Sequence, residues 1–237
     1  MLSKKIADLA PGNLNRVYFS NSGSVANDTS IRILHHYNNR LGNTKKKKIL
    51  SRIGAYHGST HLSMAMTTPA YSDGWDTEEN LVHHLKSPYS YREADGLTDD
   101  EFLDVLAEDM ITNINNIGAE NIAAFIAEPL MGAGGIIVAP DGYHKKMREI
   151  TSQYDIKYIA DEVVTAFGRL GHMFSSKDKD WLVKVDAVKS FDVIYPSIGE
   201  NFSFLKKVMK KNNLKINYIT RKEDEFCWKF SNKGYFN

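Results

Sequence analysis

The chain has 237 residues, of which 42% are hydrophobic and 25% are charged, and this composition is ordinary for a globular protein. Its net charge of +1 gives no general attraction to nucleic acid, and its single cysteine, Cys227, excludes an internal disulfide and a cysteine-based metal cluster. No apolar run reaches the length of a membrane span, and the first residues do not read as a secretory signal, so we expect a cytoplasmic protein without a membrane partner.

A change of composition divides the chain near residues 176–180. Residues 179–237 carry 12 basic and 7 acidic side chains, a net charge of +5, whereas residues 1–178 carry 18 and 22, a net charge of −4. We therefore predict one domain over 1–178 and a separate basic tail over 179–237. In the tail, the sequence indicates a strand over 191–195, a helix near 200–211 and a strand over 215–219.

Strands and helices alternate along the predicted domain. The expected strands cover 16–19, 49–53, 122–127 and 157–161. The expected helices run from about residue 22 to residue 40, from the capping-box residue Thr98, and from Asp141. Residues 67–97, which contain Thr-Pro, Ser-Asp-Gly and Ser-Pro, read as a long loop. This alternation predicts an α/β domain with a largely parallel sheet.

Polar and aromatic residues follow the carboxyl ends of these strands. They are Ser22–Ser24, Tyr56, Glu128 and Asp161. Because parallel sheets bind ligands at the carboxyl ends of their strands, we expect these residues to share one site.

The residue types at this edge suit a phosphorylated aromatic cofactor. The small-residue turn around Ser22 can offer backbone N–H groups to a phosphate, and Tyr56 can stack on a ring. A pyridine nitrogen needs a buried carboxylate, which Asp161 can supply, with Val163 beside the same ring. Each motif taken alone has a plainer explanation: a helix cap, a loop aromatic and a strand-end cap.

Other chemistries fit the pattern less well. His57 and His61 are four residues apart, but no third ligand stands at zinc-ligand spacing. Asp161 and Glu162 are adjacent and not facing, which argues against a paired-carboxylate glycosidase. The lysine run 45–48 is most simply an exposed turn, because no aromatic residues interleave it as in a single-strand nucleic-acid binder.

Four motifs occur in order, and together they resemble one enzyme family. They are SNSGSVAND at 20–28, AYHG at 55–58, AEP with GAGG at 127–135, and DEV at 161–163 followed by FGRLG at 167–171. The sequence resembles the class III aminotransferases, pyridoxal-phosphate enzymes of fold type I, and is most similar to their omega-amino-acid or amine:pyruvate branch. The resemblance implies a three-layer α/β large domain with a mostly parallel central sheet, here incomplete, and a homodimer in intact relatives.

The resemblance also implies roles for individual residues. Ser22, Gly23 and Ser24 would bind the phosphate of the cofactor. Tyr56 would stack on its ring, with His57 and Gly58 shaping that wall. Asp161 would pair with the ring nitrogen, Val163 would pack on the opposite face, and Glu128 would help to order the site.

The family's Schiff-base lysine has no matching motif in this sequence. In the family it follows the aspartate by about thirty residues, usually within Ala-Lys-Gly. Lys189 follows Asp161 by 28 residues, but no glycine comes after it and its neighbours do not match. We therefore expect a transaminase that moves an amino group from an omega-amino acid or amine to a 2-oxo acid such as pyruvate, impaired by loss of this lysine. The alternatives are a non-catalytic interaction or regulatory fragment that pairs with a full-length aminotransferase, and a chain that does not fold stably.

Overall fold

The computed structural model describes residues 2–78, 80–171 and 173–177, together with the backbones of three strands at 187–189, 219–220 and 226–227. The helices are α1 (Leu2–Leu9), α2 (Gly23–Arg40), α3 (His61–Met66), α4 (Pro69–Ser72), α5 (Ser90–Glu93), α6 (Asp99–Ile117), α7 (Tyr143–Gln153) and the short 3-10 helices η1 (Ala119–Asn121) and η2 (Ser175–Lys177). The strands are β1 (Lys48–Arg52), β2 (Val82–Leu85), β3 (Ile122–Ala127), β4 (Lys157–Asp161), β5 (Ala187–Lys189), β6 (Ile219–Thr220) and β7 (Phe226–Cys227).

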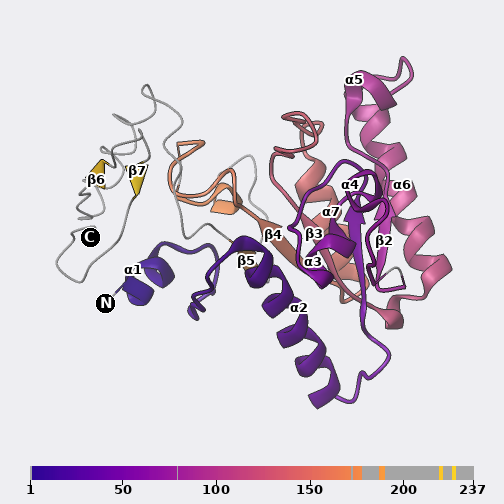
Figure 1. The fold of residues 1–237 in the computed structure, drawn as a ribbon. Coiled ribbons are helices and arrows are strands. Elements are labelled where there is room, and N and C mark those ends of the chain that lie inside the picture. The colour runs from indigo at the N-terminus through magenta and orange to yellow at the C-terminus, as the bar shows by residue number, and fades with distance from the viewer. Residues whose placement is uncertain are drawn as a thin grey trace.

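A parallel sheet forms the centre of the fold (Figure 1). Its strand order is β2-β1-β3-β4-β5, and every neighbouring pair is parallel. The carboxyl ends of all five strands therefore meet at one edge, as the alternating sequence pattern predicts. Strands β6 and β7 form a separate antiparallel pair.

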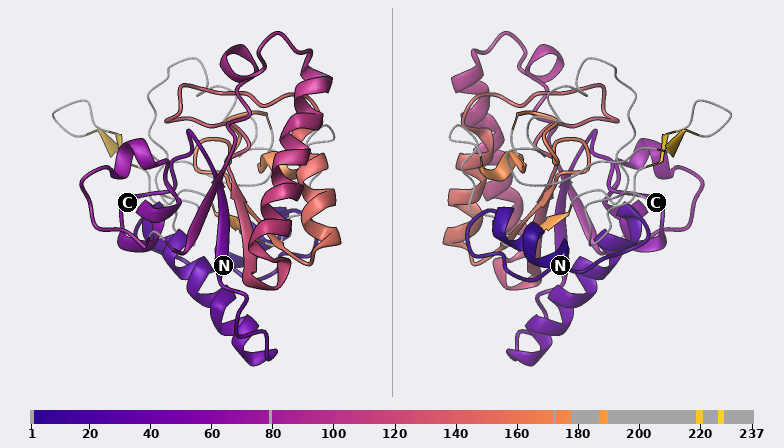
Figure 2. Two further views of the ribbon diagram at one scale, coloured as in Figure 1. Left: turned by 90° about the vertical axis from the view of Figure 1, so that its right-hand side faces the viewer. Right: turned by 90° about the vertical axis from the view of Figure 1, so that its left-hand side faces the viewer.

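Helices cover both faces of the sheet, so the domain has three layers (Figure 2). On one face α6 and α7 bury a cluster that includes Met110 and Met147 against Phe125 of β3. On the other face Ile31 of α2 and Met66 of α3 pack with residues such as Ile49, Ala124, Ile126 and Ile159. Every residue of β3 is buried, which explains its uninterrupted apolar sequence. The predicted α/β class and three-layer arrangement are confirmed.

The start of α6 agrees with its sequence signal, and the start of α7 does not. Thr98 Oγ1 accepts from Glu101 N at 3.4 Å, and a Glu101 carboxylate oxygen accepts from Thr98 N at 2.9 Å, which completes the predicted capping box. The Thr98 amide, together with the Thr98 hydroxyl that donates to the same carboxylate oxygen at 2.8 Å, lowers the pKa of Glu101. Helix α7 begins at Tyr143 after Gly142, whose φ is +78°, because the amide of Tyr143 first donates to the carbonyl of Pro140 in a turn. Asp141 is therefore not its cap.

Two other predictions along the chain were wrong. The predicted strand at 16–19 does not form, because residues 14–20 have no regular secondary structure. Tyr18 and Phe19 are exposed and not buried in the sheet. Residues 67–97 are not one loop, because they contain α4, β2 and α5. Strand β2 escaped detection because its sequence, Val-His-His-Leu, buries only Leu85 fully.

Most of the predicted tail lies outside the described residues. This holds for the strand at 191–195, the helix near 200–211 and all of the strand at 215–219 except Ile219, where β6 begins. The proposed boundary at 178 stays a prediction. Within the described part of the chain, no helix is long and apolar enough to cross a membrane.

Candidate active site

Asp161 ends β4 at the carboxyl edge of the sheet and is 2% exposed. Its Oδ2 lies 2.7 Å from His57 Nδ1, and since a carboxylate accepts, His57 carries its proton on Nδ1 and donates. Its Oδ1 accepts from the amide of Val163 at 3.3 Å, which turns the chain directly after the strand. A buried carboxylate with an oriented imidazole partner is thus fixed at this edge.

Asn27 connects α2 to the same carboxylate. Its Nδ2 donates to the carbonyl of His57 at 2.6 Å and to Asp161 Oδ2 at 3.4 Å, and the side chain is wholly buried. Asn27 Oδ1 and His57 Nε2 are buried without a hydrogen-bond partner among the described residues. Buried polar atoms normally have hydrogen-bond partners, so two unpaired polar atoms beside Asp161 are typical of a binding site.

The predicted phosphate turn, Ser22–Ser24, forms the cap and the first two residues of α2. Ser22 caps this helix: its Oγ accepts from Val25 N at 3.2 Å and its carbonyl accepts from Ala26 N at 3.0 Å. The N–H groups of Gly23 and Ser24 lie in the first turn of α2, where the helix itself provides no carbonyl acceptor. They can therefore bind an anion.

Gly58 brings a second loop against this turn. Ser24 Oγ accepts from the amide of Ser59 at 3.1 Å, and a Cβ built on Gly58 would lie 2.9 Å from Ser24 Cα. Farther along α2, Asp28 Oδ1 accepts from Thr60 Oγ1 at 2.8 Å and from Ser63 N at 3.0 Å. The beginnings of α2 and α3 are therefore held side by side.

Tyr56 lies on the loop after β1, and Glu128 fixes its backbone. Glu128 is 5% exposed, and its Oε1 accepts from Tyr56 N at 3.0 Å, while its Oε2 accepts from Gly132 N at 3.0 Å. Tyr56 is 43% exposed, so part of its side chain is accessible to a flat ligand. Glu128 thus ties the loop that carries Tyr56 to the glycine loop, residues 132–135.

A buried polar cluster supports Glu128 from within the core. Arg52 donates to the carbonyl of Glu128 at 2.9 Å, and His144 Nε2 lies 3.2 Å from the carbonyl of Pro129. Burial lowers the pKa of His144 to about 3, so the ring is neutral, its Nε2–H donates to Pro129, and its Nδ1 accepts from Tyr158 Oη at 2.7 Å. Burial also raises the pKa of Tyr158, which keeps the phenol protonated as that donor.

Glu162 holds the chain that leaves the site. It is wholly buried, and its carboxylate accepts from the amides of Ser175 and Ser176 and from the hydroxyls of Ser176 and Thr165. Val163, the residue after Glu162, is partly buried. Glu162 therefore has a structural task, and it does not face Asp161 as a second acid of a glycosidase pair.

The two histidines weighed as metal ligands go to different partners. His57 binds Asp161, whereas His61 Nε2 lies 3.1 Å from Glu78 on the exposed surface. Nearby, burial is the main cause that lowers the pKa of His84, whose Nε2 donates to the carbonyl of Thr67 at 3.0 Å. No group of three metal-binding side chains is found among the residues that the structure describes.

The backbone of Lys189 lies next to Asp161. Strand β5 pairs with β4 in parallel, and in this register Lys189 is the partner of Asp161. The structure thus brings the last residues of both strands together, at the same edge as Tyr56 and the phosphate turn.

Comparisons with known proteins agree with this geometry. The model of the family described as aminotransferase class-III matches residues 1–187. The chain belongs to the class III aminotransferase family. It is 45% identical over 177 residues to a putrescine–pyruvate aminotransferase of Pseudomonas aeruginosa, with 74% of this chain and 39% of that protein covered. It is 44% identical over 204 residues to gamma aminobutyrate transaminase 1 of Solanum lycopersicum, with 84% of this chain and 39% of that protein covered.

Solved structures of class III relatives share the fold. An (S)-enantioselective omega-transaminase from Thermomicrobium roseum matches with a TM-score of 0.76 and 40% identity, covering 79% of this chain and 42% of that one. A thermostable omega-transaminase 4-fold mutant from Pseudomonas jessenii matches with a TM-score of 0.75 and 41% identity. This match also covers 79% of this chain and 42% of the other chain. The chain thus spans about two fifths of the length of the relatives it matches.

Sequence reasoning missed three residues of this candidate site. Asn27, Thr67 and Tyr71 were not predicted, although Thr67 Oγ1 accepts from His57 N at 2.9 Å and Tyr71 contacts the ring of Tyr56. Asn27 lies within the quoted first motif, so its position was visible, but its contact with a residue 134 positions away was not. Tyr71 lies in a segment read as loop and carried no signal.

Proposed function

We propose that this chain binds pyridoxal phosphate at the carboxyl edge of its sheet and acts as a transaminase on an amine or omega-amino acid donor and a 2-oxo acid acceptor such as pyruvate. The observation that carries the proposal is the buried Asp161 with its His57 and Asn27 partners in a class III chain. The named activities of the relatives, putrescine–pyruvate and gamma-aminobutyrate transamination, support this choice of substrates.

The residues present fit the cofactor. Bound pyridoxal phosphate supplies an electron sink to an attached amino compound when its ring nitrogen is protonated. Asp161 would hold the proton at that nitrogen, and the imidazole of His57 would keep the carboxylate oriented. The amides of Gly23 and Ser24 would bind the phosphate, with Ser22 capping the helix behind them.

Two partly exposed side chains would enclose the ring. Tyr56 would cover one face, and Val163 would pack against the other. His57 and Gly58 continue the wall beside Tyr56, and both are buried. Glu128 would act on the backbone of Tyr56 and would not need to contact the cofactor.

Transfer of an amino group also requires a lysine amine to hold the cofactor and move a proton. We propose Lys189 for this role because its backbone is in register with Asp161. Its neighbours differ from the family pattern, so we expect slow turnover in comparison with the complete relatives. Class III membership supports an enzymatic site over a purely interacting fragment.

Titration of the purified full chain with pyridoxal phosphate, followed by absorbance, tests the site. We expect saturable binding that weakens about tenfold or more in Asp161→Asn, because a charged hydrogen bond to the ring is lost. The matched control is Asp155→Asn, which changes an aspartate beyond the opposite end of the same strand. Absence of saturable binding in the unaltered chain would remove the proposal.

Borohydride treatment followed by peptide mass spectrometry tests the lysine. We expect a reduced adduct on the peptide that contains Lys189, absent in Lys189→Ala and retained in Lys157→Ala. Alanine formed from pyruvate and putrescine should disappear in the same variant. Non-covalent binding with no adduct on any lysine would leave a cofactor-binding chain without transaminase activity and would refute the role of Lys189.

A further inference from the structure

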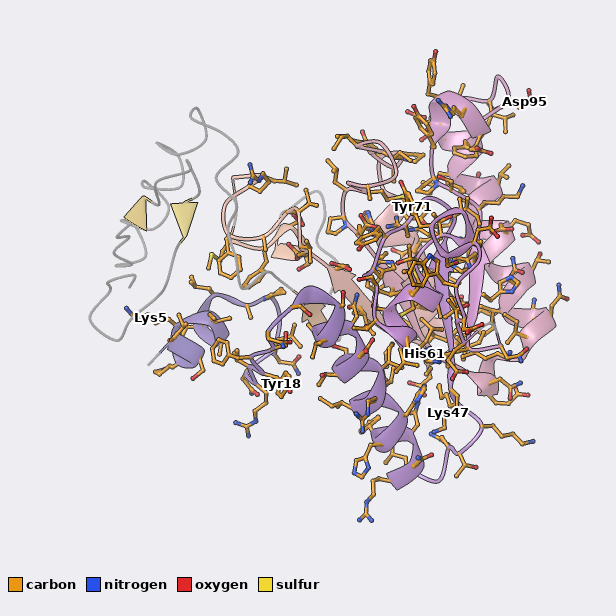
Figure 3. The ribbon with its side chains drawn as sticks, viewed as in Figure 1. Lys5, Tyr18, Lys47, His61, Tyr71 and Asp95 are labelled. Carbon is orange, nitrogen blue, oxygen red and sulfur yellow. The ribbon has the colours of Figure 1, made fainter. Side chains whose placement is uncertain are left out.

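Tyr71 of α4 joins the two loops that form the aromatic side of the site. Its ring lies 6.2 Å from the ring of Tyr56, centre to centre, at an angle of 86°. Its hydroxyl donates to the carbonyl of Ala133 in the glycine loop at 3.0 Å. Figure 3 places the labelled Tyr71 among the loops at the upper end of the sheet, at the opposite end from Lys47, which precedes β1.

Helix α4 is itself anchored beside Tyr56. The amide of Thr68, which precedes the helix, donates to the carbonyl of Ala55 at 2.8 Å, and Thr68 is 6% exposed. Tyr71 N then donates to the carbonyl of Thr68 at 2.9 Å. The position of Tyr71 is thus fixed relative to the residue directly before Tyr56.

The glycine loop provides a second fixed point. It is closed by a pair of 3.0 Å hydrogen bonds between the backbones of Met131 and Ile137. Gly134 packs so closely on the loop after β1 that a Cβ there would lie 2.5 Å from the carbonyl oxygen of Gly54. The carbonyl that receives the Tyr71 hydroxyl therefore belongs to a constrained turn.

Glu128 and Tyr71 control different parts of Tyr56. Glu128 binds the Tyr56 amide, which sets the backbone but leaves the side-chain torsions free. Tyr56 as a residue is 43% exposed, so close packing in the core does not set those torsions either. Among the described residues, the ring of Tyr56 makes an edge-to-face contact with Tyr71, a geometry that favours one ring orientation.

We infer that Tyr71 is a positioning residue that holds the Tyr56 ring ready to stack on the planar cofactor. The inference rests on the proposed function for the identity of that ligand. Tyr71 acts through Tyr56, and its hydroxyl, through Ala133, keeps Tyr71 itself in place. Loss of this preorganisation leaves the stacking surface present but requires it to be ordered when the ligand binds.

A double-mutant cycle for pyridoxal phosphate affinity tests the inference. Tyr71→Leu removes both contacts and should weaken binding about fivefold, and Tyr71→Phe, which keeps the ring pair, about twofold. In a Tyr56→Leu background, Tyr71→Leu should have no further effect, because the residue it positions is gone. Tyr37→Leu is the matched control, since Tyr37 is 48% exposed and Tyr71 is 50% exposed.

Tyrosine ring NMR of the ligand-free chain gives an independent measurement. With the Tyr56 signals assigned by Tyr56→Phe, we expect Tyr71→Leu to shift and broaden them, Tyr71→Phe to preserve them, and Tyr37→Leu to leave them unchanged. Unchanged Tyr56 signals in Tyr71→Leu would overturn the inference. An equal loss of affinity in both backgrounds would also overturn it. If the unaltered chain binds no pyridoxal phosphate, the proposed function fails, while the NMR comparison still decides the role of Tyr71.

Discussion

Replacement of Gly58 by alanine should destabilise the fold severely, because Gly58 lies where two loops of the site approach most closely. Its φ is +128°, a conformation that residues with a side chain rarely adopt. An added Cβ would lie 2.5 Å from Ser24 Oγ, 2.6 Å from Ser63 Oγ and 2.9 Å from Ser24 Cα. The two hydroxyls can rotate away, whereas Ser24 Cα belongs to the first turn of α2 and can only shift with the helix.

The cost has three parts. The unfavourable backbone conformation, which lies outside the left-handed α region, contributes about 1–3 kcal/mol. Displacement of the Ser24 hydroxyl breaks its hydrogen bond from Ser59 N, which contributes about 1 kcal/mol. Overlap with the α2 backbone is an overpacking strain of about 1–3 kcal/mol. We therefore expect Gly58→Ala to lower the free energy of unfolding by about 4 kcal/mol.

Urea unfolding of Gly58→Ala beside Gly96→Ala separates these parts. Gly96 has a φ of +84° and no atom within 4 Å of an added Cβ, so its replacement should cost about 1 kcal/mol from the backbone alone. The difference of about 3 kcal/mol measures the close approach and the lost hydrogen bond. A difference below about 1 kcal/mol would refute the argument that Gly58 is required by packing against α2.

Three further predictions concern the rest of the described fold. The amides of Ser175 and Ser176 donate to different oxygens of the Glu162 carboxylate, so Glu162→Gln puts an NH2 group against one of these two amides. Urea unfolding should show a loss of about 2 kcal/mol in the free energy of unfolding, against no change in the exposed control Glu149→Gln. Thr98→Ala removes the α6 cap and should cost about 1 kcal/mol, against little change in Thr112→Ala on the exposed side of the helix. His144→Gln should flatten the pH dependence of stability. The pKa of His144 is about 3 in the folded chain and about 6.5 in the unfolded chain. As the pH falls from about 6.5 to 4, only the unfolded chain binds a proton at this residue, so the free energy of unfolding decreases by up to about 1.4 kcal/mol per pH unit.

Each of these has a result that contradicts it. Equal unfolding free energies for Glu162→Gln and the unaltered chain would mean that the chain after β4 is held by other contacts. A Thr98→Ala variant as stable as the parent would show that α6 packing alone sets its start. If the pH dependence of stability persists in His144→Gln but vanishes in His61→Gln, which changes an exposed histidine, then His144 is not its cause.

The sequence by itself determined the class of the fold and most of the site. The apolar run at 122–127 predicted β3 because a strand buried on both faces has no polar alternation, and the structure confirms it. The Thr98 capping box is a local interaction over three residues, so it was readable without any tertiary information. The rule that parallel strands end at one edge predicted that Tyr56, Glu128 and Asp161 lie together.

Only the tertiary structure decided which side chains fix these residues. The contacts of Asn27 with Asp161 and of Tyr71 with Ala133 span 134 and 62 residues of sequence, and no periodicity or spacing encodes such pairs. Strand β2 depends on pairing with β1, since its own sequence has little apolar pattern. The register that sets Lys189 opposite Asp161 is likewise a property of strand pairing, because the residues around Lys189 do not match the family motif. Local sequence thus specifies the elements and their ends, whereas contacts between distant segments decide how the site is held in shape.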